Sequence, residues 1–376
     1  PADFVAEGLD QTRGWFYTLM VLSTALFDRP AFKNLICNGL VLAADGKKMS
    51  KSLKNYPDPN EVIDKYGADA LRLYLINSPV VRAEPLRFKE DGVFAVLKDV
   101  FLPWYNAYRF LIQNISRVEA QTNTPFIPID DTNELSNPLD RWILGASGSL
   151  IDFITNEMQG YRLYTVVPRL IEFIEQLTNI YVRYNRIRLK GDDRDSFLAM
   201  NTLFIVLLSL CKAMAPFTPF FVESMYQNLK KCLSDAEQSI HFCDFPNAPD
   251  IKYDVELQTS VSRMQNAIEM GRVIRERRNK PLKLPLARAI IAHTDNTFLQ
   301  KISSDLRSYV VSELNVRDVE VSNDVMAYVT QKATPNFATL GKRLGKSMKT
   351  VKNAVENMTN AEISLYKKCG MVELAG

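Results

Sequence analysis

Hydrophobic residues near the start of the chain form two short runs, residues 4–8 and 34–43, on either side of a longer segment. Runs of this length bounded by polar residues indicate buried strands, and the intervening residues 11–27 have the length of a helix. A strand–helix–strand order is typical of an open parallel sheet. After a polar loop, helices are predicted again over residues 59–79. The first part of the chain therefore predicts an α/β fold whose ligands bind beyond the carboxyl ends of the strands.

From about residue 93 the hydrophobic positions recur every three or four residues, as on one face of a helix. Two such series are Leu170, Ile174, Leu177 and Tyr181, and Leu257, Val261, Met264 and Ile268. This periodicity predicts an all-α helix bundle over residues 93–280. One polar segment that contains prolines, residues 119–138, interrupts the pattern and is predicted to be a linker between helices.

The pattern changes again after Pro281. Residues 286–293 and 325–330 are apolar runs of strand length, and residues 296–314 between them are predicted to form one helix. These elements predict a small α/β module over residues 281–376. No capping or tail signal closes the sequence after this module, and we expect the module to be truncated.

Composition and charge limit the possible functions. The chain has 46 basic and 43 acidic residues, so a surface for nucleic acid requires local clusters rather than net charge. Its five scattered cysteines and two histidines include no Cys-x-x-Cys pair, which indicates reduced thiols and no structural metal. The uncharged run 14–27 is shorter than the ~20 residues of a membrane-spanning helix, and no secretory signal is visible. We therefore expect no membrane association, and the start at Pro1 indicates a fragment.

The polar loop after the second predicted strand contains the string KMSKS, residues 48–52. Lysine, serine, aspartate and glycine are common in solvated loops, which is the simplest interpretation. A given five-residue string arises by chance only about once in ten thousand chains of this length, however, so a specific function is worth pursuing. Four further strings accompany it: GADALRLYL (67–75), NPLDRWIL (137–144), MAPFTPFFVE (214–223) and SIHFCDFP (239–246).

This combination resembles the class I aminoacyl-tRNA synthetases, whose second signature is KMSKS in a loop that leaves a strand. The string at 67–75 is similar to the one that follows the signature in the branch for large hydrophobic amino acids. The other three strings resemble the start and the end of that branch's anticodon-binding helices. The resemblance implies that residues 1–92 are the second half of a Rossmann-like catalytic domain with a parallel sheet, and that residues 93–280 are an α-helical anticodon-binding bundle.

Within this family, EGLDQTRGWF (7–16) resembles the isoleucine-specific members, and NIYVRYNRIRLKG (179–191) is similar to their archaeal and eukaryotic cytosolic type. One departure is Lys54, where much of the branch has glycine. The resemblance implies a cytoplasmic enzyme that activates isoleucine with ATP and Mg²⁺ and transfers it to tRNA(Ile). It therefore implies isoleucine, ATP and tRNA(Ile) as binding partners, and it allows other synthetases as partners in a complex.

The lysines of the signature suit this chemistry. Attack of a carboxylate on the α-phosphate of ATP builds negative charge on phosphate oxygens, and preorganised cations stabilise that charge. A lysine ammonium on its flexible stem can follow the departing pyrophosphate. The resemblance implies that Lys48 and Lys51 are catalytic contacts to the phosphates, and that the ATP-binding residues are Lys48, Met49, Ser50, Lys51 and Ser52.

The resemblance also implies a site for the aminoacyl-adenylate near the end of the first strand. The implied binding residues are Glu7, Gly8, Asp10, Gln11 and Trp15. The two carboxylates would accept hydrogen bonds from the ribose and the amino group, and the indole would line the pocket for the isoleucine side chain. Two alternatives stay open: Asp10 as an ordinary charge at a helix N-terminus, and Trp15 as a core residue.

Basic residues gather in two places within predicted helices, where they either contact tRNA phosphates or are simply solvated. The first cluster is Arg183, Arg186, Arg188 and Lys190, and the second is Arg272, Arg275, Arg277, Arg278, Lys280 and Lys283. The sequence favours neither interpretation.

The other class I signature, His-Ile-Gly-His, is absent from this sequence, because its only histidines are His241 and His293. We therefore expect residues 1–376 alone to be inactive and the function to belong to a longer enzyme. A valine-specific synthetase and a non-catalytic tRNA-binding paralogue are the alternatives. The presence of both EGLDQ and KMSKS favours an enzyme, because a binding module needs no adenylate pocket.

Overall fold

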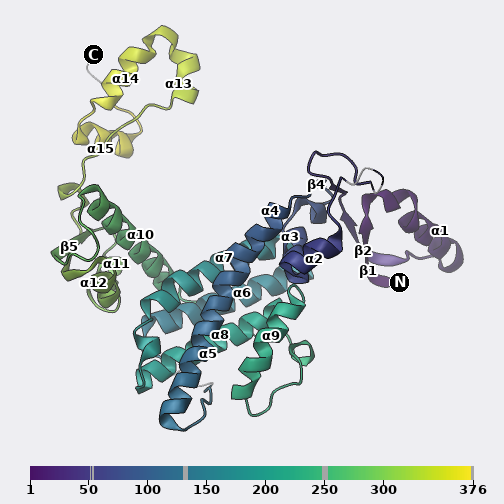
Figure 1. Ribbon diagram of the computed structural model, residues 1–376. Helices are drawn as coiled ribbons and strands as arrows, with labels where there is room; N and C mark the ends of the chain where they lie inside the picture. Colours follow the sequence, from purple (N-terminus) through teal and green to yellow (C-terminus); the bar gives the residue numbers. More distant parts are fainter. Residues whose placement is uncertain (51, 53–54, 130–133, 248–252, 374–376) are drawn as a thin grey trace. The chain divides into compact units, whose positions relative to one another are not determined.

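The computed structural model describes residues 1–50, 52, 55–129, 134–247 and 253–373. The chain divides into two compact units, Pro1–Thr259 and Ser260–Gly376. The boundary falls within α10 (Val255–Arg277), which begins in the first unit and ends in the second (Figure 1). The domain boundaries placed after residues 92 and 280 stay a prediction.

The first unit opens with the predicted strand–helix–strand arrangement. β1 (Ala2–Gly8) pairs in parallel with β2 (Phe32–Asn38), and α1 (Trp15–Phe27) connects the two strands. A second, shorter parallel pair consists of β3 (Val41–Leu42) and β4 (Leu86–Arg87). The α/β fold class predicted for the start of the chain is therefore confirmed.

Between β3 and β4 lie the lysine-rich loop and the two predicted helices. α2 (Pro59–Tyr66) begins where the Asp58 side chain accepts a hydrogen bond from the Asn60 amide at 2.8 Å. Pro59 occupies the first turn, where its missing N–H costs no hydrogen bond. α3 (Ala68–Ile76) follows after Gly67, whose φ of 86° favours glycine.

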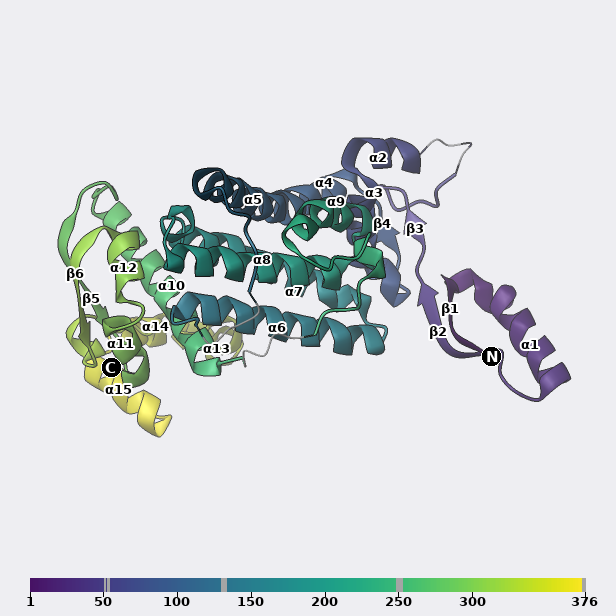
Figure 2. The ribbon, with the colours of Figure 1, turned by 90° about the horizontal axis from the view of Figure 1, so that it is seen from below.

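The rest of the first unit is a helix bundle, whose long helices lie side by side in Figure 2. Its helices are α4 (Glu90–Val96), α5 (Leu102–Thr122), α6 (Pro138–Gln159), α7 (Val166–Glu175), α8 (Arg194–Met214) and α9 (Pro219–Leu229). π-helical turns at Leu97–Phe101 and Gln176–Val182 precede α5 and extend α7. All residues of the two series predicted from the helical periodicity are buried, as expected.

Helix α8 is apolar along most of its length. Its uncharged run Ser196–Cys211 is longer than residues 14–27, and by length and composition alone α8 is able to cross a membrane. However, 72% of its most apolar stretch is buried inside the protein, and the helix packs against α5, α6 and α9. A helix that is apolar all round and covered by other helices is typical of a protein core.

The linker predicted at residues 119–138 begins later than expected. α5 continues to Thr122, and Asn123 ends it with a φ of 54°. Phe126 is buried against the rings of Phe197 and Phe204, so the linker is anchored in the bundle core. The polar composition located the linker but not its first residue.

The second unit combines one parallel strand pair with short helices. β5 (Leu286–Ala292) pairs with β6 (Val316–Ser322), and α11 (Asn296–Ser303) and α12 (Arg307–Leu314) lie between them in the sequence. The remaining helices are α13 (Phe337–Leu344), α14 (Met348–Glu356) and α15 (Asn360–Cys369).

Two predictions for this unit were wrong. Residues 296–314 form two helices rather than one, because the backbone leaves the helical conformation at Ser304. Residues 325–330 are not a strand: they begin with a 3₁₀ turn in which the Asp324 side chain accepts a hydrogen bond from the Ala327 amide. The second strand is β6, in which Val316 and Val319 are buried and Val321 is exposed.

Candidate functional site

The lysine-rich loop leaves the carboxyl end of β3 and folds back on the strand. The Ala43 amide donates to the Lys47 carbonyl at 2.9 Å, and the Gly46 amide donates to the Ala43 carbonyl at 2.8 Å. Gly46 has a φ of 84°, and a Cβ at this position would lie 3.1 Å from Nε of Arg87. The turn before the signature therefore favours glycine for both its conformation and its space.

The signature residues that the structure describes present polar groups to solvent. Lys48 and Ser52 are exposed, Met49 and Ser50 are half-buried, and the hydroxyls of Ser50 and Ser52 are 2.7 Å apart. Lys51 was predicted to be catalytic and lies outside the described residues, as does Lys54. Within the described part of the chain, no carboxylate lies within ion-pair distance of Lys48. The ammonium group of Lys48 is thus available to an anionic ligand.

The side chain of Asn55 binds the main chain of the signature. Its amide nitrogen donates to the Lys48 carbonyl at 3.1 Å, and its amide oxygen accepts a hydrogen bond from the Ser50 amide at 2.9 Å. A hollow of about 460 Å³ lies beside the loop, with Met49, Tyr56 and Phe88 among its lining residues. Asn55 was not among the predicted site residues, although an asparagine just before a Pro-Asp-Pro turn is a typical loop-forming residue.

The predicted adenylate residues follow one another from the end of β1 into α1. Glu7 is exposed at the strand end, and its carboxylate accepts a hydrogen bond from the Gly8 amide at 3.0 Å. Asp10 and Gln11 lie in a 3₁₀ turn over Leu9–Arg13. A Cβ on Gly8 would lie 2.6 Å from a carboxylate oxygen of Asp10, so a larger residue here would require the Asp10 side chain to move.

The side chain of Gln11 caps the first turn of α1. Its side-chain oxygen accepts a hydrogen bond from the Trp15 amide at 3.0 Å, and its amide nitrogen donates to Asp10 at 3.4 Å. Trp15 itself is 46% exposed, whereas the adjacent Phe16 is only 4% exposed. In this part of the chain the buried aromatic residue is therefore Phe16, and the indole of Trp15 faces open space.

The second helix after the signature loop, α3, is hydrogen-bonded to the bundle. The guanidinium of Arg72 on α3 donates to the carbonyls of Pro216 and Phe217 at 3.0 and 3.1 Å. Asp69 on the same helix accepts a hydrogen bond from the Phe221 amide at 2.6 Å, and burial raises the pKa of its carboxyl. The string at 67–75 thus contacts the string at 214–223.

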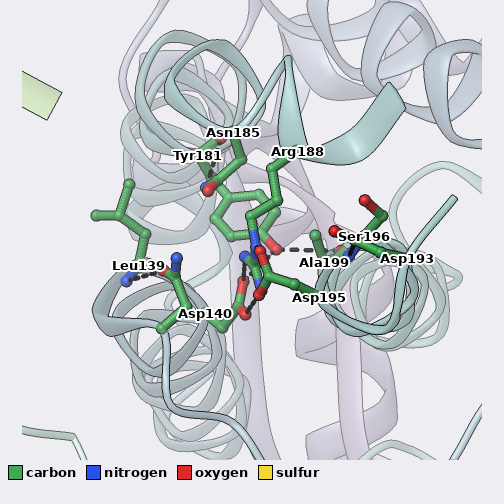
Figure 3. A network of polar contacts seen from close by, with 10 residues as sticks. Leu139, Asp140, Tyr181, Asn185, Arg188, Asp193, Asp195, Ser196 and Ala199 are labelled. Carbon is green, nitrogen blue, oxygen red and sulfur yellow. Dashed lines mark hydrogen bonds and ion pairs between the residues drawn. The ribbon is translucent and has the colours of Figure 1, made fainter. Parts of the chain in front are cut away.

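Each basic cluster contains arginines that hold the fold together. In the first cluster, Arg188 donates to both carboxylate oxygens of the fully buried Asp140 at 2.8 and 2.6 Å, and Tyr181 donates to Asp140 at 2.6 Å (Figure 3). Burial raises the pKa of Asp140, while the bonds from Arg188 and Tyr181 act in the opposite direction. Arg188 also binds Asp195 at 2.6 Å. The positive charge of Arg188 is therefore neutralised by two carboxylates of the protein.

The second cluster is divided in the same way. Arg275 is 5% exposed and donates to the carbonyls of Leu314 and Pro281, and Arg272 forms an ion pair with Glu313. The other four members, Arg277, Arg278, Lys280 and Lys283, are exposed. Solvation and RNA contact therefore stay alternatives only for the exposed members.

A groove of about 510 Å³ runs between α5 and the π-helical turn 176–182. Its lining includes the amides of Asn106 and Asn179 and the ring of Phe110, with the guanidinium of Arg186 at 5.9 Å from the ring centre. Aromatic rings, amides and arginines are the groups that bind an unstacked RNA base. Sequence reasoning identified Arg186 but missed Asn106 and Phe110, because no basic cluster marks α5.

Comparison with known proteins gives the following similarities. Residues 1–87 match the family model described as tRNA synthetases class I (I, L, M and V), and residues 140–291 match that of the anticodon-binding domain of tRNA ligase. Within the described residues, no group of three potential metal ligands is present.

Three relatives are each named as a cytoplasmic isoleucine–tRNA ligase. The chain is 58% identical to that of Arabidopsis thaliana, 53% to that of Mus musculus and 49% to that of Saccharomyces cerevisiae, over 100% of this chain in each case. It covers 32%, 30% and 36% of their lengths, so it spans about a third of the curated relatives that it matches.

One solved structure shares the fold. It is a LeuRS from Agrobacterium radiobacter K84 in a ternary complex with tRNA and LeuAMS, with a TM-score of 0.50 and 21% identity. The match covers 68% of this chain and 30% of that one.

Proposed function

The chain belongs to the class I tRNA synthetases of the isoleucine, leucine, methionine and valine group, and from this premise we propose that it forms part of an isoleucyl-tRNA synthetase. The observation that carries the proposal is that three cytoplasmic isoleucine–tRNA ligases align with 100% of this chain at 49–58% identity. The enzyme activates isoleucine with ATP, transfers it to tRNA(Ile) and works in the cytoplasm. Residues 1–376 supply the second half of its catalytic domain and its anticodon-binding bundle.

In the proposed reaction, the signature loop holds the phosphates of ATP. The isoleucine carboxylate attacks the α-phosphate, pyrophosphate leaves, and negative charge on the phosphate oxygens increases in the transition state. Lys48 and Lys51 stabilise this charge, and the Ser50 and Ser52 hydroxyls are further donors beside them. Mg²⁺ arrives bound to ATP as part of the substrate. No carboxylate among the described residues pairs with Lys48, which supports this role, because a nearby carboxylate would compete with the phosphates.

The EGLDQ segment supplies the adenylate site in this proposal. Glu7 and Asp10 accept hydrogen bonds from the ribose hydroxyls and the substrate ammonium group. Glu7 lies at the carboxyl end of β1 and Asp10 just beyond it, which is where ligands bind in parallel α/β sheets. Gln11 holds the adenylate with the amide that now binds Asp10, and its oxygen keeps the first turn of α1 in place. The exposed indole of Trp15 forms one wall of the isoleucine pocket.

The bundle binds the anticodon end of tRNA(Ile). The groove beside the π-helical turn 176–182 offers the Phe110 ring for stacking and the amides of Asn106 and Asn179 for hydrogen bonds to base edges. Arg186 adds positive charge at the same place. We place tRNA contact on the groove residues and not on Arg188, whose guanidinium is bound to two carboxylates.

Amino-acid-dependent ATP–pyrophosphate exchange tests this proposal. The full-length enzyme should exchange with isoleucine in strong preference to valine, and residues 1–376 alone should show no exchange. A preference for valine would make this a valine-specific enzyme. No exchange with either amino acid by the full-length protein, together with intact tRNA binding, would indicate a non-catalytic paralogue.

A further inference from the structure

We propose that Asn55 is a positioning residue for amino-acid activation, because its side chain fixes the main chain of the signature loop on both sides of Met49. The inference rests on the proposed function for its catalytic consequence, while its structural basis is independent. The side-chain amide forms two hydrogen bonds with the loop. Its nitrogen donates to the Lys48 carbonyl at 3.1 Å, and its oxygen accepts from the Ser50 main-chain amide at 2.9 Å. Asn55 makes no contact with substrate in this scheme.

Two hydrogen bonds from one planar group restrict the loop more than one bond would. The two main-chain atoms belong to the peptide units that flank Met49, so the bonds set the backbone conformation of Met49 and the direction in which Lys48 and Ser50 project. Fixing a residue's backbone in one conformation costs conformational entropy. The hydrogen bonds of Asn55 order the loop before ATP binds, so this entropy is not lost during binding or reaction. The loop is in this sense preorganised.

Asparagine is suited to this position because its side chain carries a donor and an acceptor at the same reach. An aspartate accepts from the Ser50 amide but has no hydrogen to give to the Lys48 carbonyl. An alanine makes neither bond. The clamp also avoids a charged group, so the lysine ammonium groups are not neutralised before the phosphates arrive.

The base of the clamp is itself rigid. Pro57 and Pro59 flank Asp58, and the Asp58 side chain accepts a hydrogen bond from the Asn60 amide at the start of α2. Proline fixes its own φ and restricts the residue before it. α3, which follows α2, is bonded to the bundle through Asp69 and Arg72. Asn55 therefore connects the signature loop to a part of the chain that is held in place by the bundle.

The test uses the full-length enzyme with Asn55→Ala and Asn55→Asp, and with Asn60→Ala and Asn60→Asp as matched controls. Asn60 lies five positions further along, and its bond to Asp58 is made by the main-chain amide, which both substitutions keep. We expect Asn55→Ala to lower kcat for isoleucine-dependent pyrophosphate exchange at least tenfold, with KM for isoleucine and the melting temperature unchanged. Asn55→Asp should lower kcat at least as much. Both Asn60 variants should stay within twofold of the wild-type protein.

A second measurement does not depend on activity. Limited trypsin digestion of the same proteins should cut after the loop lysines several-fold faster in Asn55→Ala than in the wild-type protein or Asn60→Ala, because the loop has lost its two bonds. An Asn55→Ala kcat within twofold of wild type, or a fall in kcat matched by a lower melting temperature, would overturn the positioning role. Absence of any isoleucine exchange by the wild-type enzyme would overturn the proposed function. Trypsin cleavage of Asn55→Ala at the wild-type rate would contradict the structural role of Asn55, whatever the result of the exchange assay.

Discussion

The signature loop and the polar network of the bundle both contain basic side chains within the first unit, but they use the charge in opposite ways. In the loop, Lys48 is exposed and its main chain is held by the neutral amide of Asn55. In the bundle, the side chain of Arg188 is 12% exposed and is bound to Asp140, which is fully buried, and to Asp195 (Figure 3).

This difference follows from what each charge has to do. A cation that receives a phosphate must keep its charge uncompensated, so its position is set through uncharged hydrogen bonds. A cation inside a bundle must be neutralised, since removing a charge from water costs several kcal/mol unless a partner replaces the hydration. Proximity of arginines or lysines in a sequence therefore does not define an RNA surface.

The largest expected effect tests the structural side of this comparison. Arg188→Ala should destabilise the bundle by about 3–5 kcal/mol, because it leaves Asp140 buried without its cation. The matched control is Arg194→Ala, whose ion pair with Glu134 is more than 45% exposed on both sides and should matter by at most about 1 kcal/mol. Thermal melting and urea unfolding of the two variants provide the measurement.

Equal destabilisation by the two arginine variants would show that burial of the Asp140 pair carries no special cost. A stable Arg188→Ala enzyme with weakened tRNA binding would place Arg188 at the RNA surface after all.

The second prediction tests the catalytic side. Lys51→Ala in the full-length enzyme should lower isoleucine-dependent pyrophosphate exchange at least tenfold, because removing one preorganised contact to developing charge typically costs ~3 kcal/mol. Its melting temperature should equal that of the wild-type enzyme, in contrast to Arg188→Ala. Lys47→Ala is a control, since Lys47 is already paired with Asp45 at 3.3 Å. An exchange rate for Lys51→Ala within twofold of wild type would remove it from catalysis.

The third prediction concerns the exposed indole beside the adenylate segment. Trp15→Ala should lower kcat/KM for isoleucine more than for valine, because the shorter valine side chain reaches the pocket wall less. One methylene in an apolar pocket is worth about 1–3 kcal/mol, a range for which isoleucyl-tRNA synthetases are themselves an established example. The comparison is pyrophosphate exchange with each amino acid. An unchanged ratio in a folded variant would assign Trp15 a packing role instead.

The smallest effect is a pH dependence at the end of α6. Arg162 and then Thr165 bind the Glu157 carboxylate and lower its pKa to about 2. The folded state therefore keeps Glu157 ionised at pH values where the unfolded chain protonates it. The resulting stabilisation of the folded state is complete above pH 4.5 and is lost as the pH falls towards 2. The melting-temperature advantage of the wild-type protein over Glu157→Gln should shrink as the pH falls from 6 to 3. A difference that is constant with pH would contradict this assignment.

The sequence by itself determined the elements whose signals are local. The strand–helix–strand order at the start, the helices after the lysine-rich loop and the buried series on α7 all follow from hydrophobic spacing, which depends only on neighbours a few residues away. The signature string likewise identified the loop. Where a local signal was ambiguous the prediction failed: the apolar run at 325–330 was chosen as a strand, while β6, whose valines are separated by charged residues, was overlooked.

Only the tertiary structure decided which polar residues serve the fold and which are left for ligands. Arg186 and Arg188 are two positions apart in one cluster, yet Arg186 lies over Phe110 beside the groove while Arg188 binds a carboxylate 48 residues earlier in the chain. Asn55 resembles any loop asparagine until its amide is seen on the main chain of Lys48 and Ser50. A hydrogen bond or an ion pair depends on which groups folding brings within about 3 Å, and sequence separation does not limit that choice.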